Sequence, residues 1–221
     1  LKRSKMNGTI YTIGYSGFSI EDFVKKIKNN NINCVIDVRS SPFSKYFPQY
    51  NKEFVKKYLN NNNILYMNFL EFGARQTDPK FFNPKGYLDF EKYTQSLSFL
   101  HGTERVVNGI AKGYNIALMC AEKEPSHCHR TIMISRWFDK NDFNIIHFMP
   151  NNIRNKKQKD IDVELLMHFF KKDYSKKDNS LMRQRSLFEI DSGVDTQEEK
   201  IDEAYRLQNA IIGFKQEDGE G

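Results

Sequence analysis

Residues 118–130, LMCAEKEPSHCHR, bring together side chain types that can do chemistry. The segment holds two cysteines, two histidines, two glutamates and an arginine within thirteen positions. Thiols, imidazoles and carboxylates serve as nucleophiles and proton carriers, and the same groups ligate metal ions. The residue types alone therefore leave three interpretations open: a metal site, a reactive thiol, or a polar loop with a purely structural role.

A zinc site would use Cys120, His127, Cys128 and His129. Structural zinc ligands usually come as pairs with two to four residues between their members. The adjacent side chains at 127–129 diverge, so at most two of them can readily share one ion. We therefore predict no metal cofactor, and zinc or iron is the less favoured alternative.

The thiol interpretation depends on what surrounds Cys120. This cysteine ends an apolar run, and His129 and Arg130 come at the predicted start of the next helix. Helix N–H groups and neighbouring positive charge lower the pKa of a thiol and also bind anions. Cys120 is thus a candidate nucleophile, and a small buried core residue is the alternative.

A second candidate group follows the apolar stretch CVIDV at residues 34–38. A carboxylate such as Asp37 is costly inside an apolar strand unless it is paired. Arg39 lies two positions further on the same strand face, and Arg130 could approach from another strand. Two interpretations stay open for Asp37: a structural ion pair, or a carboxylate that orients an arginine or a ligand hydroxyl or acts as a base.

Apolar β-rich segments alternate with amphipathic ones along the first 150 residues. The predicted strands are residues 9–15, 34–38, 64–69, 115–120 and 144–149. The predicted helices are residues 20–30, 52–61 and 129–140, with two further helical pieces within 87–113 that separate at Gly102. This alternation predicts an α/β fold with a five-stranded, mainly parallel sheet and helices on both faces.

In an open parallel sheet, ligands bind beyond the carboxyl ends of the strands. Every predicted strand here leads into polar residues, so we expect these residues to meet at one edge. The predicted catalytic residues are Asp37, Cys120, Glu122 and His129. The predicted substrate-binding residues are Tyr15, Ser16, Arg39, Ser40, Arg75 and Arg130. His147, at the end of the fifth strand, is a further candidate for proton transfer.

Residues 151–221 read differently from the preceding domain. They predict a basic linker, a short amphipathic helix at 162–172, a flexible tether and a C-terminal helix within 196–214, which packs either on its own chain or between subunits. Residues 1–150 carry 21 basic and 13 acidic groups, whereas residues 186–221 carry 3 and 10. A basic body permits a polyanionic partner such as nucleic acid, and a merely solvated lysine-rich surface is the alternative.

The cellular location follows from two absences in the sequence. There is no apolar run of membrane-spanning length and no leader-like apolar start. Three cysteines, an odd number, fit a reducing compartment better than a disulfide framework. We therefore expect a cytoplasmic protein without a membrane partner.

Three segments together resemble one known family. TIGYSGFSIEDF, VIDVRSSPFSKYFPQYN and LMCAEKEPSHCHR, in this order, resemble the marker segments of the domain of unknown function DUF488. The resemblance covers residues 9–150, so the predicted domain is 7–150. It implies a Rossmann-like α/β domain and no agreed reaction.

A shorter resemblance lies in the predicted tether. QRSLF at residues 184–188 is similar to the peptide by which many bacterial proteins dock on the replication sliding clamp. Gln184 would set the register while Leu187 and Phe188 fill an apolar pocket. The alternative is that Leu187 and Phe188 pin the tail to its own domain.

Two functional hypotheses follow. The first is an intracellular enzyme that acts on a nucleotide-like, phosphorylated or nucleic-acid substrate by acid–base or thiol chemistry, as a hydrolase or transferase. The second is a non-catalytic, DNA-associated accessory module recruited to the sliding clamp. The oligomeric state stays open.

Overall fold

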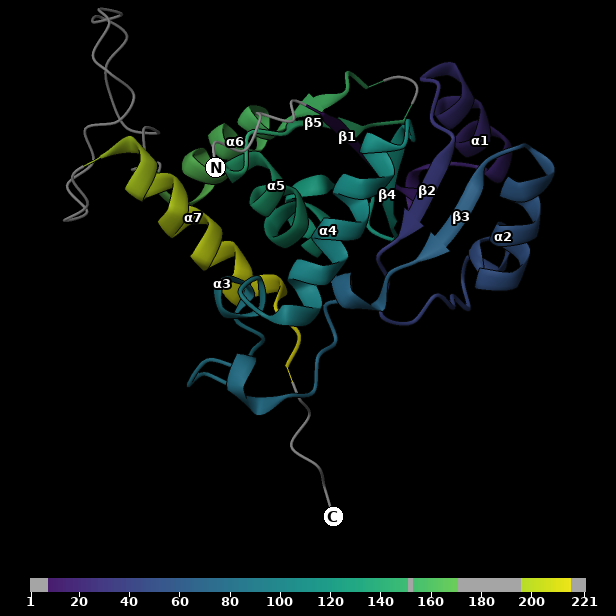
Figure 1. Ribbon diagram of the computed structural model, residues 1–221. Coiled ribbons are helices and arrows are strands. Elements are labelled where there is room, and N and C mark those ends of the chain that lie inside the picture. The colour runs from purple at the N-terminus through teal and green to yellow at the C-terminus, as the bar shows by residue number, and fades with distance from the viewer. Residues whose placement is uncertain (1–7, 151–152, 171–195, 216–221) are drawn as a thin grey trace, which may run out of the picture.

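Six strands form one sheet in the computed structural model, which describes residues 8–150, 153–170 and 196–215 (Figure 1). They are β1 (Thr9–Gly14), β2 (Cys34–Asp37), β3 (Leu65–Asn68), β4 (Ile116–Cys120), β5 (Asn144–Phe148) and β6 (Lys156–Lys157). The first five strands pair in parallel, whereas β6 runs antiparallel to β5. The prediction of five strands misses β6, because a two-residue strand in a basic segment shows no β periodicity in the sequence.

The strands lie in the order β3-β2-β4-β1-β5-β6, so β4 lies between β2 and β1. A Rossmann order would put the first two strands side by side. The α/β class is as predicted, but the order of the strands differs from the Rossmann order. Hydrophobic periodicity does not encode the order of strands in a sheet.

Helices cover both faces of the sheet (Figure 1). The amphipathic helices α1 (Ile20–Asn29) and α2 (Lys52–Asn61) pack their apolar side chains on one face. The opposite face is covered by α3 (Phe90–Tyr93), α4 (Leu97–Ala111), α5 (Arg136–Lys140), α6 (Gln158–Phe170) and α7 (Gln197–Ile212). Both faces of the central strands are buried, which explains their continuous apolar runs. None of the described helices has the length and apolar character needed to span a membrane.

Gly102 does not separate two helices, contrary to the sequence prediction. It lies inside α4, where an added Cβ would come 2.9 Å from Cε1 of Phe72. The glycine thus lets the buried Phe72 ring pack closely against the helix, and that contact offsets the modest cost of an interior glycine.

The helix predicted for residues 129–140 is not regular. It begins with a π-helix, Arg130–Ser135, and continues as α5. A π-helix inserts an extra residue into the turn and occurs frequently at functional sites. Here it follows directly on His129, at the end of the segment 118–130 that carries Cys120 and Cys128.

Helix α7 packs on its own chain through a buried chain of hydrogen bonds. His147 on β5 contacts Gln158 of α6 at 2.9 Å, and the Gln158 amide donates to the Tyr205 hydroxyl of α7 at 2.7 Å. Tyr205 in turn donates to Asp162 at 2.8 Å. The described C-terminal helix is therefore held by the sheet and by α6 of its own chain.

Replacing Tyr205 with phenylalanine is expected to lower the free energy of unfolding by about 1–3 kcal/mol, because the buried partners of the hydroxyl lose their hydrogen bonds. Urea denaturation would measure the change. Tyr46→Phe is the matched control, since the Tyr46 side chain is 87% exposed and should change stability by less than about 0.5 kcal/mol. Equal values for the two variants would contradict the docking of α7.

Candidate functional site

The carboxyl ends of β1, β2, β3 and β4 lie in one row. Gly14 is paired with Cys120, and Asp37 is paired with both Met119 and Asn68. Two groups of polar side chains gather at this row. One is the ion pair of Asp37 and Arg39, and the other contains the two cysteines of the 118–130 segment.

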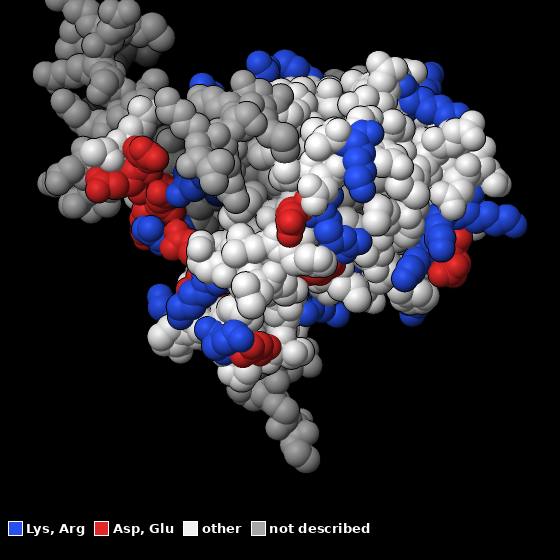
Figure 2. Space-filling view, in the orientation of Figure 1, with Lys and Arg blue, Asp and Glu red and all other residues white. Residues whose placement is uncertain are grey.

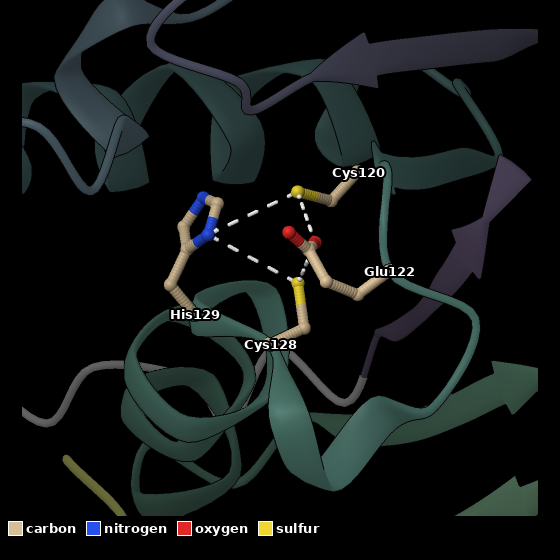
Figure 3. A group of neighbouring side chains, drawn as sticks. All are labelled: Cys120, Glu122, Cys128 and His129. Atoms are coloured by element: carbon tan, nitrogen blue, oxygen red, sulfur yellow. Dashed lines mark hydrogen bonds between the residues drawn. The ribbon is translucent and has the colours of Figure 1, made fainter. Parts of the chain in front are cut away.

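Cys120, Glu122, Cys128 and His129 form what we term the thiol–carboxylate cluster (Figure 3). The Glu122 Oε2 atom lies 3.0 Å from Cys120 Sγ and 2.9 Å from Cys128 Sγ. Nδ1 of His129 lies 3.9 Å and 4.0 Å from the same two sulfurs. One donor atom from each residue lies within 4.8 Å of all the others, a spacing that a single metal ion can bridge.

The loop after β4 folds back to build the cluster. A 3₁₀ turn, Pro125–His127, returns the chain so that Cys128 faces Cys120. The Arg130 guanidinium donates to the carbonyl oxygens of Glu122 at 2.6 Å and Lys123 at 3.4 Å. Arg130 thus holds the loop from inside instead of facing solvent.

Gly14 leaves space for the same loop. A Cβ at this position would lie 1.8 Å from the carbonyl oxygen of Glu122, which no side chain tolerates. The next turn adds a hydrogen bond from the Ser16 amide to the Ala121 carbonyl at 3.1 Å. The end of β1 and the loop after β4 therefore fit together only with glycine at position 14.

The orientation of His129 is set by β2. Nε2 lies 3.0 Å from the carbonyl oxygen of Val38, which can only accept a hydrogen bond, so Nε2 carries the proton. In the neutral imidazole the lone pair is then on Nδ1, the atom that faces the two sulfurs.

The members of the cluster differ in exposure. The two sulfur-bearing residues are buried, with Cys120 2% and Cys128 1% exposed. His129 is partly buried, and Glu122 is exposed while its carboxyl group turns inward toward the thiols. Glu122 is thus the residue of the cluster that has the most contact with solvent.

The pKa values within the cluster shift in different directions. Burial raises the pKa of Cys120, and loss of hydration against the thiols raises the pKa of the Glu122 carboxyl group. Burial opposes ionisation of Cys128, but contact with Cys120 and the positive charges of Arg130 and His129 outweigh it and lower its pKa. Burial likewise disfavours the charged form of His129, yet contact with Cys128 raises the pKa of the imidazole.

Asp37 and Arg39 form a closed, bidentate pair. Arg39 Nε donates to Oδ1 at 2.9 Å, Nη2 donates to Oδ2 at 2.6 Å, and the Tyr66 hydroxyl donates to Oδ2 at 2.7 Å. Asp37 is fully buried and Arg39 is 5% exposed. Arg39 also contacts the Tyr50 carbonyl and lies over the Tyr15 ring. The donors and acceptors of this pair are thus engaged within the protein.

The remaining predicted site residues are spread along the same edge. Tyr15 is buried, and its hydroxyl accepts from Arg39 at 3.3 Å. Ser40 accepts a hydrogen bond from the backbone of Arg75, and Arg75 is exposed. His147 is fully buried between Thr12 and Gln158 on the other side of β1 from the cluster. Gln184, Leu187 and Phe188 lie outside the described residues.

One cluster member was absent from the predicted site. Cys128 belongs to the alternative zinc set, together with His127, but His127 is exposed and lies outside the cluster. The sequence did indicate this possibility. At most two of the adjacent residues 127–129 can share one ion, and Cys128 with His129 is such a pair. The exposed rings of Phe43 and Tyr46, on the loop after β2, were also missed.

The fold and the site define a class: an α/β protein with a mainly parallel sheet and a cluster of two thiols, a carboxyl group and an imidazole at its carboxyl edge. The chain belongs to the family described as domain of unknown function DUF488, whose model matches residues 19–137, slightly more than half of the sequence. The match includes the whole thiol–carboxylate cluster. Neither the curated proteins nor the solved structures contain a significant match to this chain.

Proposed function

We propose that the protein is an enzyme, a hydrolase or transferase, in which Glu122 acts as general base at the carboxyl edge of the sheet. The observation that carries this proposal is the difference in exposure within the cluster. A group that takes a proton from a reactant must reach it, and Glu122 is exposed whereas both thiols are buried. Its raised pKa also brings the carboxylate nearer to neutral pH, where a general base is most effective.

The exposure pattern favours acid–base chemistry over attack by a thiol. A covalent mechanism would require Cys120 or Cys128 to meet the substrate, and burial raises the pKa of Cys120. The Asp37 carboxylate is enclosed by Arg39 and Tyr66, so the role that we assign to it is to hold Arg39 and the end of β2. The catalytic roles predicted for Asp37 and Cys120 remain predictions.

We propose a nucleotide-like or nucleic-acid substrate. Phe43 is 70% and Tyr46 87% exposed, with the exposed Lys45 between them in sequence. Exposed aromatic rings beside positive charge are the usual means of stacking bases and contacting phosphates. The loop that bears them is anchored by hydrogen bonds from the Ser44 amide to Asn51 and from the Lys52 amide to the Pro42 carbonyl.

The distribution of charge supports the same substrate class. On the face drawn in Figure 2, lysine and arginine side chains are spread over the sheet domain, while acidic side chains gather along α7. The exposed Arg75 lies on the loop after β3, bonded through its backbone to Ser40 at the carboxyl edge. Arg75 can therefore meet an anionic group, whereas Arg39 and Arg130 are buried with most of their donors engaged internally.

The experiment is a turnover assay with nucleotides, phosphate esters and single-stranded oligonucleotides. Glu122→Gln is expected to reduce kcat/KM by about 100-fold or more, the usual contribution of a general base. Wild-type activity should rise with pH as the Glu122 carboxyl group ionises, because only the ionised carboxylate accepts a proton, and this limb should be absent in the variant.

Glu124→Gln is the matched control, because Glu124 is two residues away and pairs with Lys156 outside the cluster. It should retain activity. Full activity in Glu122→Gln would refute the general-base assignment. Salt-sensitive binding of DNA without turnover, unchanged in Glu122→Gln, would instead favour the non-catalytic accessory module docked on the sliding clamp through Gln184, Leu187 and Phe188.

A further inference from the structure

We propose that the thiol–carboxylate cluster is a zinc site. The two sulfurs of Cys120 and Cys128 and Nδ1 of His129 are its three protein ligands, and Glu122 lies beside the fourth, open position. The binding of the ion stands on its own geometry, and only its part in catalysis rests on the proposed function.

The spacing of the three donors fits one tetrahedral ion. With zinc–sulfur distances of about 2.3 Å and zinc–nitrogen distances of about 2.0–2.1 Å, neighbouring ligand atoms lie roughly 3.5–4 Å apart. His129 Nδ1 lies 3.9 Å from Cys120 Sγ and 4.0 Å from Cys128 Sγ. The two sulfurs lie within 4.8 Å of each other, so the three donors need only modest movements to coordinate zinc.

The protein orients the imidazole as a metal ligand. A zinc-bound histidine usually donates its second N–H to a carbonyl or carboxylate, which fixes the ring and directs the other nitrogen at the ion. Nε2 of His129 makes this contact with the Val38 carbonyl at 3.0 Å. The bond comes from a neighbouring strand, so it holds the ring independently of the loop that bears the cysteines.

The donor types select the metal. Two thiolates and an imidazole suit zinc, whereas magnesium and calcium require oxygen ligands. Both cysteines are buried, so the ion would bind beneath the surface, between the end of β4 and the start of the π-helix. Two thiolates also balance the double positive charge of the ion.

The fourth position faces Glu122. Three protein ligands and an open position are typical of catalytic zinc, which lowers the pKa of a bound water to about 7. Glu122 is the exposed member of the cluster, with its carboxyl group turned toward both sulfurs. The carboxylate would then hold and deprotonate a water at this position, which is the general-base role proposed above.

The test uses the full-length chain, purified without metal and titrated with Co²⁺ and then Zn²⁺. We expect one ion per chain, a sulfur-to-cobalt charge-transfer band, and visible bands of tetrahedral intensity that zinc abolishes. Cys120→Ser, Cys128→Ser and His129→Gln should each weaken binding by on the order of 100-fold or more. Glu122→Gln should keep the metal, because its side chain is not one of the three ligands.

Two in-chain controls match the ligand variants. Cys34→Ala removes the third cysteine, which lies in β2 at the opposite end from the site, and His127→Gln removes the exposed neighbour of Cys128. Both should bind Co²⁺ as the wild type does. Because a cysteine variant can fail to fold, proton release provides a second measurement: zinc binding to the wild type should release protons from thiols, and His129→Gln should reduce the affinity while the fold is retained.

Absence of a thiolate–cobalt band in the folded wild type, or a band that survives unchanged in Cys120→Ser and Cys128→Ser, would overturn the zinc site. Loss of the band in Glu122→Gln would overturn the open fourth position. Stoichiometric zinc with no turnover of any substrate would support the site and count only against the proposed function. Full turnover after complete removal of metal would count only against the catalytic role of the ion.

Discussion

Asp37→Ala is expected to destabilise the protein by about 3–5 kcal/mol, because it leaves the Arg39 guanidinium buried without its counter-charge. Arg39 is 5% exposed, and two nitrogens of its guanidinium group donate to Asp37. The substitution also removes the acceptor of the Tyr66 hydroxyl. Urea denaturation of the wild type and the variant would measure the difference in the free energy of unfolding.

A surface ion pair provides the comparison. Asp78 pairs with Lys80 at 2.7 Å, but their side chains are 46% and 67% exposed, so Asp78→Ala should cost less than about 1 kcal/mol. The double variant Asp37→Ala/Arg39→Met should recover part of the loss, because it removes the uncompensated charge. A loss below about 1 kcal/mol in Asp37→Ala would show that the pair is solvated and free to take part in other chemistry.

Acid is expected to destabilise the fold through His147. Burial, together with the nearby positive charge of Arg130, lowers the pKa of this imidazole to about 3, from an ordinary value of 6.5. Between these pH values the unfolded chain binds a proton that the folded chain does not. The contribution of His147 to stability is therefore complete above about pH 6.5 and is lost as the pH falls, at about 1.4 kcal/mol per pH unit.

The window from pH 6.5 to 5 suits the measurement because most carboxylates titrate below it, and comparison with a His147 variant removes the contribution of groups that both proteins share. Stability should fall there by about 2 kcal/mol in the wild type. His147→Gln can keep both hydrogen bonds, to Thr12 and Gln158, without a titrating group, so its stability should fall by about 2 kcal/mol less than that of the wild type over the same window. An equal slope in the two proteins would assign the acid sensitivity to other groups.

The sequence carried enough information to predict the strands and their direction. Continuous apolar runs such as Cys34–Asp37 and Ile116–Cys120 predict strands buried on both faces, and the parallel sheet of the structure has them within a few residues of the expected bounds. Because parallel strands share a carboxyl edge, the polar residues after them were expected to meet. Cys120, Glu122 and His129 do lie together there.

The depth at which the polar residues are buried and the order of the strands could not be predicted from the hydrophobic pattern of the sequence. Periodicity indicates which face of a strand is buried, but it does not indicate that a loop folds over Arg130 or that Tyr50 and Tyr66 enclose the Asp37–Arg39 pair. The convergence of Cys128 with Cys120 likewise depends on the turn at Pro125–His127. The position of β4 between β2 and β1 follows from packing that local sequence does not encode.

The contribution of three adjacent strands to one cluster has a consequence for folding. Cys120 and Cys128 are neighbours in sequence, but the carbonyl that orients His129 comes from the end of β2, and the gap that admits the loop comes from Gly14 at the end of β1. The two partners in each of these contacts are about a hundred residues apart in the sequence. Bringing them together costs conformational entropy, and this cost slows the formation of the contacts. We therefore expect the cluster to be among the last features to assemble. In a nascent chain whose first strands are not yet paired, the thiols would not yet have their final geometry.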